Sequence, residues 1–409
     1  MNYILFDDAS RMDLLPLTFL RPVADIRLGI LTIREKWEKM LGEETSTLTE
    51  RYLATKYPLK KDKNNILING SVCPTKDMVK QVKALKPDEC LVSAEYIIAL
   101  HVAEKDLEQL VGNEGMTEEE IEKAELDKMK EIVCTAPHIK LDHPWDVFVH
   151  NGQAIEEDFS LLTARRKSAK LSETNRVLKP ERVFVEEGVK AEFVNINAST
   201  GPVYIGKNAE IMEGALLRGP LAIGENAVVK MGAKLYGNTT IGPGCKVGGE
   251  VNNVVFFGNS NKAHDGFIGN SVIAEWCNLG ADTNNSNLKN TYDEVRIWSY
   301  NQERFIPTGK QFCGLIMGDH SKCGINTMFN TGTVVGIFAN IFGHGYQRNF
   351  IPSFSWGSSL TGYTTYDIKK ALQVAEYVYK RRDHELEPVD REILETVHKL
   401  TFTYRKKRV

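Results

Sequence analysis

An apolar residue recurs at every sixth position over a long stretch that begins near residue 205. A first run consists of Ile205, Ile211, Leu217, Ile223, Val229, Leu235, Ile241 and Val247, and a second run consists of Met317, Cys323, Phe329, Val335 and Ile341. Four residues after most of these positions stands a small or β-branched residue, as at Ala209, Ala215 and Thr327. A period of six fits neither a helix nor a simple strand. It predicts a parallel β-helix, in which three short strands form one triangular coil.

The pattern is interrupted between Val251 and Met317, and interruptions of a repeat fold commonly carry loops and function. Within the interruption, residues 293–312 contain a short apolar and aromatic run that predicts a hairpin arm. After the second run, residues 366–382 and 390–402 show helical spacing of apolar positions. We expect these helices to cap or flank the end of the coil.

Short apolar runs alternate with amphipathic stretches in residues 1–165, which predicts an α/β domain. Inside it, the glutamate-rich residues 113–129 predict a solvated surface helix with Thr117 as its N-cap. Polar residues 166–180 form the expected linker. The β-helix is then expected over residues 181–352, and a helical segment over residues 353–409.

The composition is that of a globular protein of ordinary polarity. Of the 409 residues, 42% are hydrophobic and 26% are charged, and the net charge is −3. Basic residues cluster only at 405–408, so nothing favours a nucleic-acid partner. No apolar run is long enough to cross a bilayer and the first residues lack a signal-peptide pattern, so we expect a cytoplasmic protein without membrane contact. The seven cysteines contain no C-x-x-C pair and are expected to be structural thiols.

Several segments in and around the interruption carry the motifs of a known family. Residues 217–220 read L-R-G-P, similar to L-R-P-G, and residues 261–269 resemble S-K-A-G-H-L-T-Y-L-G. Residues 278–283 resemble N-I-G-A-G-T, Asn287 falls on the asparagine of C-N-Y-D-G, and residues 317–327 follow in register. Together they resemble the bifunctional GlmU enzymes, which join a sugar-nucleotide pyrophosphorylase domain to a left-handed β-helix acetyltransferase domain. The resemblance implies a left-handed coil and a homotrimer.

The resemblance also implies roles for individual residues. His264 falls on the catalytic histidine, and an imidazole suits removal of a proton from a sugar amine because it titrates near neutral pH. Arg218 and Lys262 would clamp the sugar phosphate, for which a guanidinium offers two parallel hydrogen bonds. The other implied contacts are Asn278 and Asn287 to the sugar or pantetheine, and Thr327 and Ala339 to acetyl-CoA. The alternative for His264 is a solvated or backbone-bonded histidine at a corner of the coil, and the alternative for Arg218 is a surface arginine at such a corner.

Some positions depart from the family pattern. Asn252 and Asn253 stand near the place where the family has two lysines that hold substrate, and Ile325 replaces a serine on the acetyl-CoA side. The loss of two positive charges puts glucosamine 1-phosphate in doubt as the substrate.

The N-terminal segment 5–18 is similar to the phosphate loop L-A-G-G-x-G-T-R-L-x-P-L-T of the pyrophosphorylases. It retains Arg11, expected to bind nucleotide, and the Pro-Leu-Thr ending, but each glycine is replaced. Asp7 and Asp8 would repel a triphosphate, so they either hold Mg²⁺ or mark a domain that no longer binds nucleotide. Where the family has a metal-binding aspartate, this chain has Ile68-Asn69-Gly70-Ser71. The segment predicts a divergent nucleotidyltransferase-like fold.

Three hypotheses follow. The first is a homotrimeric transferase that moves an acetyl group from acetyl-CoA to an amino sugar phosphate or nucleotide sugar, with His264 as base. The second is a sugar-1-phosphate nucleotidylyltransferase that uses the first domain, with Mg²⁺ at Asp7 or Asp8 and the coil for assembly. The third is a scaffold or ligand sensor without catalytic activity.

Overall fold

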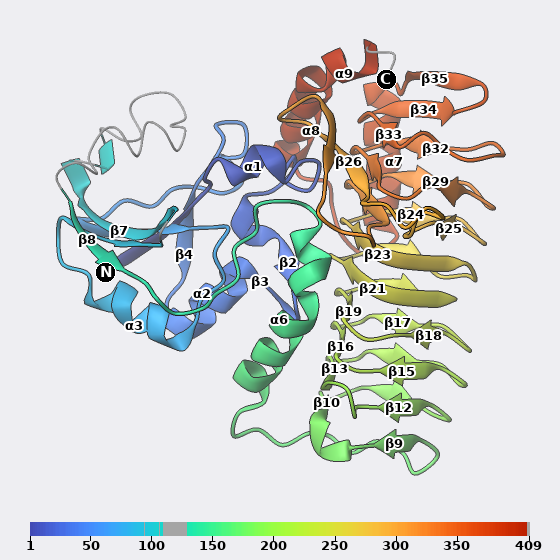
Figure 1. Ribbon diagram of the computed structural model, residues 1–409, viewed down its shortest axis with the longest axis horizontal. Coiled ribbons are helices and arrows are strands. Elements are labelled where there is room, and N and C mark those ends of the chain that lie inside the picture. The colour runs from blue at the N-terminus through green and yellow to red at the C-terminus, as the bar shows by residue number, and fades with distance from the viewer. Residues whose placement is uncertain (94, 106, 109–128, 407–409) are drawn as a thin grey trace. The chain divides into compact units, whose positions relative to one another are not determined.

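The computed structural model describes residues 1–93, 95–105, 107–108 and 129–406 (Figure 1). The chain divides into two compact units. The first contains Met1–Leu14, Leu20–Ile26 and Leu31–His143, and the second contains Leu15–Phe19, Arg27–Ile30 and Pro144–Val409. Of the helix expected at residues 113–129, all but residue 129 lies outside the described residues. Among the helices in the described part of the chain, none has the length and apolar character needed to span a bilayer.

The first unit is an α/β fold around one mixed sheet, as the sequence predicts. The strands follow the order β4-β1-β5-β7-β6-β8. Their bounds are β1 Asn2–Phe6, β4 Thr45–Leu48, β5 Asn64–Asn69, β6 Glu89–Val92, β7 Ile97–Ala103 and β8 Lys130–Val133, and the helices are α1 Ser10–Asp13, α2 Ile33–Leu41 and α3 Lys76–Ala84. Because β1 pairs in parallel with both β4 and β5, the carboxyl ends of these strands meet at one edge of the sheet. Polar residues that follow these strands, such as Asp7, Asp8 and Ser71, therefore come together there.

The second unit contains a parallel β-helix, which confirms the main prediction from the six-residue period; its left-handedness stays a prediction. Strands stack in one column from β9 to β35 (Figure 1). One long sheet contains β9 Arg176–Leu178, β10 Val183–Val185, β12 Asn195–Asn197, β13 Val203–Ile205, β15 Leu216–Arg218, β16 Leu221–Ile223, β18 Lys234–Leu235, β19 Thr239–Ile241, β21 Glu250–Phe256, β23 Phe267–Ile273, β28 Leu315–Met317, β31 Thr333–Val335 and β33 Phe350–Ile351. A second contains β11 Lys190–Ala191, β14 Glu210–Ile211, β17 Val228–Val229, β20 Lys246–Val247, β22 Asn261–Lys262, β24 Asn278–Leu279, β29 Lys322–Cys323, β32 Asn340–Ile341, β34 Ser355–Ser358 and β35 Gly362–Thr365. Two further short strands, β25 Asn284–Asn285 and β30 Met328–Phe329, pair in parallel.

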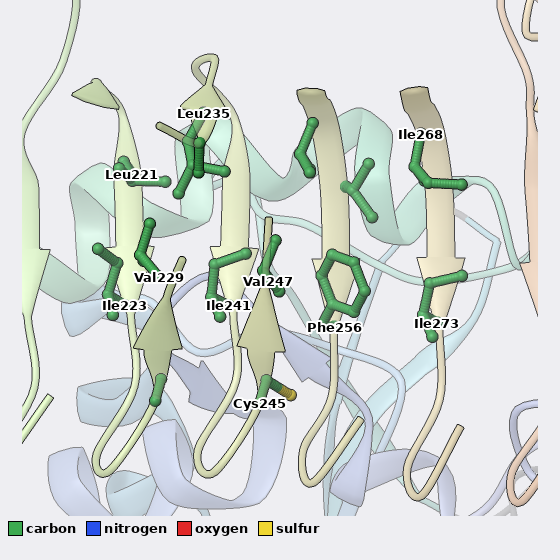
Figure 2. Packing of buried hydrophobic residues seen from close by; sticks show 14 of the residues in the cluster. Leu221, Ile223, Val229, Leu235, Ile241, Cys245, Val247, Phe256, Ile268 and Ile273 are labelled. Carbon is green, nitrogen blue, oxygen red and sulfur yellow. The ribbon is translucent and has the colours of Figure 1, made fainter. Parts of the chain in front are cut away.

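The recurring apolar side chains fill the inside of the coil. The parallel register places Ile211 beside Val229 and Val229 beside Val247, so identical positions of successive coils form a ladder. Figure 2 shows Val229 and Val247 in this interior, with Cys245 nearby. Cys245 is buried and free, and burial raises the pKa of its thiol to about 12. The expectation of structural thiols is thereby supported at this position.

Between residues 251 and 317 the coil continues with altered spacing. β21 and β23 are each seven residues long and pair with each other in parallel. Only two residues separate Val247 from the next strand, whereas four separate Lys262 from β23. The predicted hairpin arm is confirmed as β26 Arg296–Ser299 and β27 Arg304–Pro307, which are antiparallel.

The C-terminal helices lie along one corner of the coil. Their presence confirms the helices predicted over residues 366–382 and 390–402. They are α7 Ile368–Lys380, α8 Pro388–Leu400 and α9 Phe402–Lys406, and the second unit also contains α6 Asp146–Thr163. At the corner that these helices contact, residues with positive φ include Asn208 and Asn226 in the early coils and Trp276, His320 and Phe338 in the later ones. Such a conformation costs an aromatic residue about 1–2 kcal/mol. Packing offsets that cost, because the ring of Tyr379 from α7 stacks on Trp276 with centroids 4.2 Å apart.

Candidate active site

His264 stands on a corner of the coil, between β22 and β23, and its side chain is exposed. It borders a groove of about 760 Å³. The groove is lined by Met212, Lys230, Met231, Gly248, Gly249, Ala263, His264, Asp265, Ala281 and Asp282. Within the described residues we find no hydrogen bond to the imidazole. The ring nitrogens are therefore accessible to a molecule that enters the groove, and Lys230 supplies a positive charge in the same groove.

Lys262 lies inside the coil. The register places it beside Val247, in the ladder that elsewhere contains Val229, Leu279 and Cys323. It is only 1% exposed, and its Nζ donates hydrogen bonds to the backbone oxygens of His264, at 2.5 Å, and Asp265, at 2.8 Å. This position disagrees with the expected role as a phosphate clamp, because the ammonium is directed to carbonyls of its own corner and away from solvent.

Burial lowers the pKa of Lys262 from 10.5 to about 8, although the charges of Asp265, Asp282 and Cys323 oppose that shift. The unfolded chain keeps the proton up to its higher pKa, so it binds more protons than the native state between these two values. In that window stability rises with pH. We expect the free energy of unfolding of the wild type to gain roughly 1–3 kcal/mol relative to Lys262→Met between about pH 8 and about pH 10.5. Urea unfolding of both proteins over this range measures the difference, and parallel pH curves would contradict the expectation.

Arg218 lies on a different surface of the coil. It is the last residue of β15, where alternate side chains point outward, and it borders a groove of about 500 Å³ together with Arg176, Lys234 and Tyr236. This groove shares no lining residue with the groove at His264. Within one chain, the structure therefore does not bring Arg218 and His264 together.

The remaining residues expected to bind substrate or acetyl-CoA are scattered. Asn278 is exposed on β24 and accepts a hydrogen bond from Asn261 at 3.3 Å. Asn287 donates from Nδ2 to Asn270 at 2.8 Å. Thr327 is fully buried and donates from Oγ1 to the oxygen of Gly324 at 2.8 Å. Its hydroxyl thus contributes to the corner itself, which disagrees with an expected contact to acetyl-CoA.

Ala339 is 1% exposed and belongs to the apolar interior of the coil. Its backbone N–H donates to Ser321 Oγ at 3.0 Å. Because its side chain fills the interior and its N–H is bonded to Ser321, this position does not fit the expected acetyl-CoA contact. The register of the repeat places both Thr327 and Ala339 at inward positions.

In the first unit, Asp7 and Arg11 form a buried ion pair. Arg11 Nη1 lies 2.7 Å from Asp7 Oδ2 and donates also to the oxygen of Arg21 at 3.1 Å. Nη2 donates to the hydroxyl of Tyr52 at 3.1 Å, and the N–H of Val23 donates to Asp7 Oδ1 at 2.7 Å. The expected nucleotide contact of Arg11 is not visible in this arrangement, because the guanidinium is turned to groups of its own unit.

Asp8 lies at the carboxyl end of β1 and is surrounded by donors. Ser10 N–H donates to Oδ1 at 3.1 Å, Asn69 donates to Oδ2 at 2.8 Å, and Ser71 Oγ donates to Oδ2 at 3.3 Å. Lys140 Nζ lies 3.3 Å from Oδ2. No group of three or more residues able to hold a metal occurs in the described part of the chain. Because a lysine already neutralises Asp8 and an arginine neutralises Asp7, these residues do not fit the Mg²⁺ site expected from the sequence.

Lys140 is a residue of this cluster that no sequence motif indicates. Its ammonium also contacts Asp142 and lies 5.1 Å from the ring of Tyr96. The hydroxyl of Tyr96 in turn lies 2.6 Å from His138 Nε2. A lysine 132 positions beyond Asp8 carries no local signal, because only the fold of the first unit brings the two together. The result is a polar cluster at the edge where parallel strands end, the usual place for ligands in open α/β sheets.

Comparison with known proteins supports both halves of the resemblance. Residues 3–167 match the family described as sugar nucleotidyl transferase. A bifunctional sugar-1-phosphate nucleotidylyltransferase/acetyltransferase from Sulfurisphaera tokodaii is 33% identical over 93 residues, 23% of each protein. The bifunctional protein GlmU from Methanococcus aeolicus is 31% identical over 87 residues, 21% of this chain and 20% of that protein. The chain thus spans about a fifth of the length of these relatives.

Another relative matches over a longer segment. The uncharacterized acetyltransferase YaiX from Escherichia coli is 37% identical over 147 residues, 36% of this chain and 63% of that protein. A solved structure, an Arabidopsis UDP-N-acetylglucosamine acyltransferase, is 16% identical and covers 52% of this chain and 80% of its own, with a TM-score of 0.23. A TM-score of this size does not establish a shared fold. The matching family and the curated relatives are transferases, and the resemblance to GlmU-like proteins is confirmed.

Proposed function

We propose that the β-helix catalyses acyl transfer from acyl-CoA to an amino sugar phosphate or nucleotide sugar, with His264 as the general base. The observation that carries the proposal is the exposed, unbonded imidazole of His264 at the edge of a groove that also contains Lys230. The acetyltransferase names of several relatives support it. Acetyl-CoA is the donor we expect, in a cytoplasmic enzyme.

The chemistry requires little beyond alignment and one proton acceptor. The acceptor's ammonium first loses one proton to solvent. The lone pair of the neutral amine then attacks the thioester carbonyl while imidazole Nε2 or Nδ1 takes a second proton from that nitrogen. The C–S bond then breaks, and the imidazolium returns its proton to the departing thiolate. Lys230 in the groove is placed to attract the phosphate of the acceptor or of CoA. Asp265 and Asp282 in the same lining favour an acceptor that carries a positive amino group.

Arg218 enters this proposal only through a second copy of the chain. Its groove and that of His264 are separate in one chain, so a joint contact to one substrate needs the face of a neighbouring subunit. The homotrimer is therefore part of the proposal, and symmetric assembly is the usual way to combine such surfaces. Asn278, exposed on β24, is the remaining substrate contact that we propose.

Release of free CoA thiol tests the proposal. The purified chain is incubated with acetyl-CoA and a panel of amino sugars, their 1-phosphates and their nucleotide conjugates. We expect acceptor-dependent thiol release with at least one phosphorylated amino sugar. No release across the panel, together with no rise in melting temperature on addition of any CoA thioester, would favour a scaffold.

The first unit supports a second candidate function, sugar-1-phosphate nucleotidylyl transfer. The observation that favours it is the cluster of Asp8, Asn69 and Lys140 at the carboxyl ends of β1 and β5. A nucleoside triphosphate would offer Lys140 a stronger anionic partner than Asp8. In addition, the sugar nucleotidyl transferase family matches these residues.

We expect Lys140→Met to lower the affinity for nucleoside triphosphates about tenfold or more, because one ammonium contact to phosphate is lost. Isothermal titration with UTP, dTTP and GTP measures this, and pyrophosphate release with a sugar 1-phosphate measures turnover. The control is Lys130→Met, since Lys130 on β8 is an exposed lysine that also pairs with a carboxylate, that of Glu89 on β6. Equal affinity of Lys140→Met and wild type would exclude this site.

A further inference from the structure

The corner that carries His264 differs from four corresponding corners of the same sheet, those that follow β14, β17, β24 and β29. In these four the third residue after the inward position has positive φ: Gly214, Gly232, Asp282 and Asn326. The N–H of the fourth residue commonly closes such a corner, as when Ala233 donates to Lys230 at 3.1 Å and Thr283 donates to Gly280 at 3.3 Å. In the corner 263–266 the positive φ moves to the fourth residue, Gly266, at 111°. Among the backbone hydrogen bonds of the described residues, none closes this corner in that way.

A lysine takes the place of the missing closure. Lys262 Nζ reaches the carbonyl oxygens of His264 and Asp265 from inside the coil. The Asp265 oxygen also accepts from Asp282 N at 3.0 Å, and the Gly266 oxygen accepts from Glu250 N at 3.2 Å. Consecutive carbonyls of the corner are thus held by donors of the coil, and the side chain of His264 is left exposed.

An inward-pointing lysine such as Lys262 destabilises the interior of the coil, so its presence there requires an explanation. An aliphatic residue at this place would continue the ladder of Val247 and Leu279, and an ammonium in such surroundings loses its hydration. Position 266 admits only glycine, because a Cβ there would lie 2.3 Å from the backbone oxygen of Thr283. Both residues hold the corner 263–266 in a shape that differs from the four regular corners.

We propose that Lys262 is a positioning residue that presents His264 to the groove by fixing the carbonyls of residues 264 and 265. The inference deepens the proposed acyl transfer and rests on it for its kinetic part. Its structural part, the fixation of the corner, stands without any catalytic activity. Lys262 itself touches no substrate in this scheme.

The test compares Lys262→Met with Lys322→Met in the full-length chain. Lys322 is a matched control because its Nζ also donates to a backbone oxygen two residues away, that of His320, at 2.9 Å. Hydrogen exchange of the Asp282 and Glu250 amides reports on the corner, since both donate to its carbonyls. We expect Lys262→Met to accelerate this exchange about tenfold, while exchange at Gly232 stays unchanged. Lys322→Met should leave all three amides and the turnover as in the wild type.

For acyl transfer, we expect Lys262→Met to lower kcat about 10–100-fold and to change KM for acetyl-CoA less than about twofold. The reason is that the variant loses the orientation of the His264 imidazole but no contact to acetyl-CoA. Lys262→Gln keeps one amide donor, so its kcat and its exchange rates should lie between those of the wild type and Lys262→Met. It also replaces the methionine variant if that one does not fold. Unchanged exchange in the folded variants would overturn the proposal, as would unchanged kcat in an enzyme whose turnover depends on His264. Faster exchange in an enzyme whose turnover does not need His264 would sustain the fixation of the corner and refute the acyl-transfer mechanism.

Discussion

His264→Gln is expected to lower kcat for acyl transfer about 10²–10⁴-fold, the usual contribution of a positioned general base. Glutamine keeps a polar side chain of similar reach but does not titrate near neutral pH, so it cannot accept the proton of the acceptor's amine. Because the imidazole is exposed and unbonded within the described residues, its loss should leave the melting temperature within a few degrees of the wild type. Thiol release under saturating acetyl-CoA measures the effect.

The matched control is His344→Gln. His344 is also exposed and stands three residues after the inward Ile341, on a corner of a later coil. Its replacement should change kcat less than about twofold. The same loss of rate in both variants, or full activity of His264→Gln, would remove His264 from the mechanism. A residual rate that rises with pH in His264→Gln is expected, since the fraction of deprotonated amine then limits the reaction.

Arg11→Met is expected to destabilise the first unit by about 3–5 kcal/mol, because it leaves the buried Asp7 carboxylate without its cation. Asp7 and Arg11 are both enclosed, with side chains 5% and 7% exposed. Burial raises the pKa of Asp7 and Arg11 opposes that shift, so without Arg11 the carboxyl group would take up a proton more readily and recover part of the loss. Urea unfolding followed by a probe in the first unit measures the change.

The double variant Asp7→Asn/Arg11→Met separates the ion pair from a ligand site. If the pair only supports the fold, removing both charges should restore most of the stability lost in Arg11→Met. The control Lys80→Met removes an exposed partner of Asp77 and should cost no more than about 1 kcal/mol. A double variant that regains stability and still binds UTP, dTTP or GTP like the wild type would show that Arg11 is not a nucleotide contact.

Several features could be predicted from the sequence because their signals are local and periodic. The six-residue period directs Ile211, Val229 and Val247 to the interior, and their stacking follows directly from it. The hairpin β26–β27 and the helices α7 and α8 were likewise visible as aromatic alternation and helical spacing. His264 could be found because a motif surrounds it.

In residues 247–268 the six-residue period no longer predicts which side chains point inward. The step between successive inward positions is six residues from Val229 to Leu235 but four from Val247 to Val251. Counting by six beyond Val247 therefore points to the wrong residues. The inward position of Lys262 therefore became visible only from its pairing with Val247. The resemblance suggested a phosphate contact for a lysine that the coil directs to its own carbonyls.

By itself the sequence determined the β-helix, the α/β character of the first unit and the exposed histidine, because repeat period, alternation and motif are properties of neighbouring residues. Tertiary structure alone decided which charges meet. It joins Lys140 to Asp8 across the first unit, turns Lys262 inward, and separates Arg218 from His264 within one chain. The physical reason is that an ion pair or a buried ammonium depends on distance and solvent exclusion, and neither quantity is encoded in the spacing of residues along the chain.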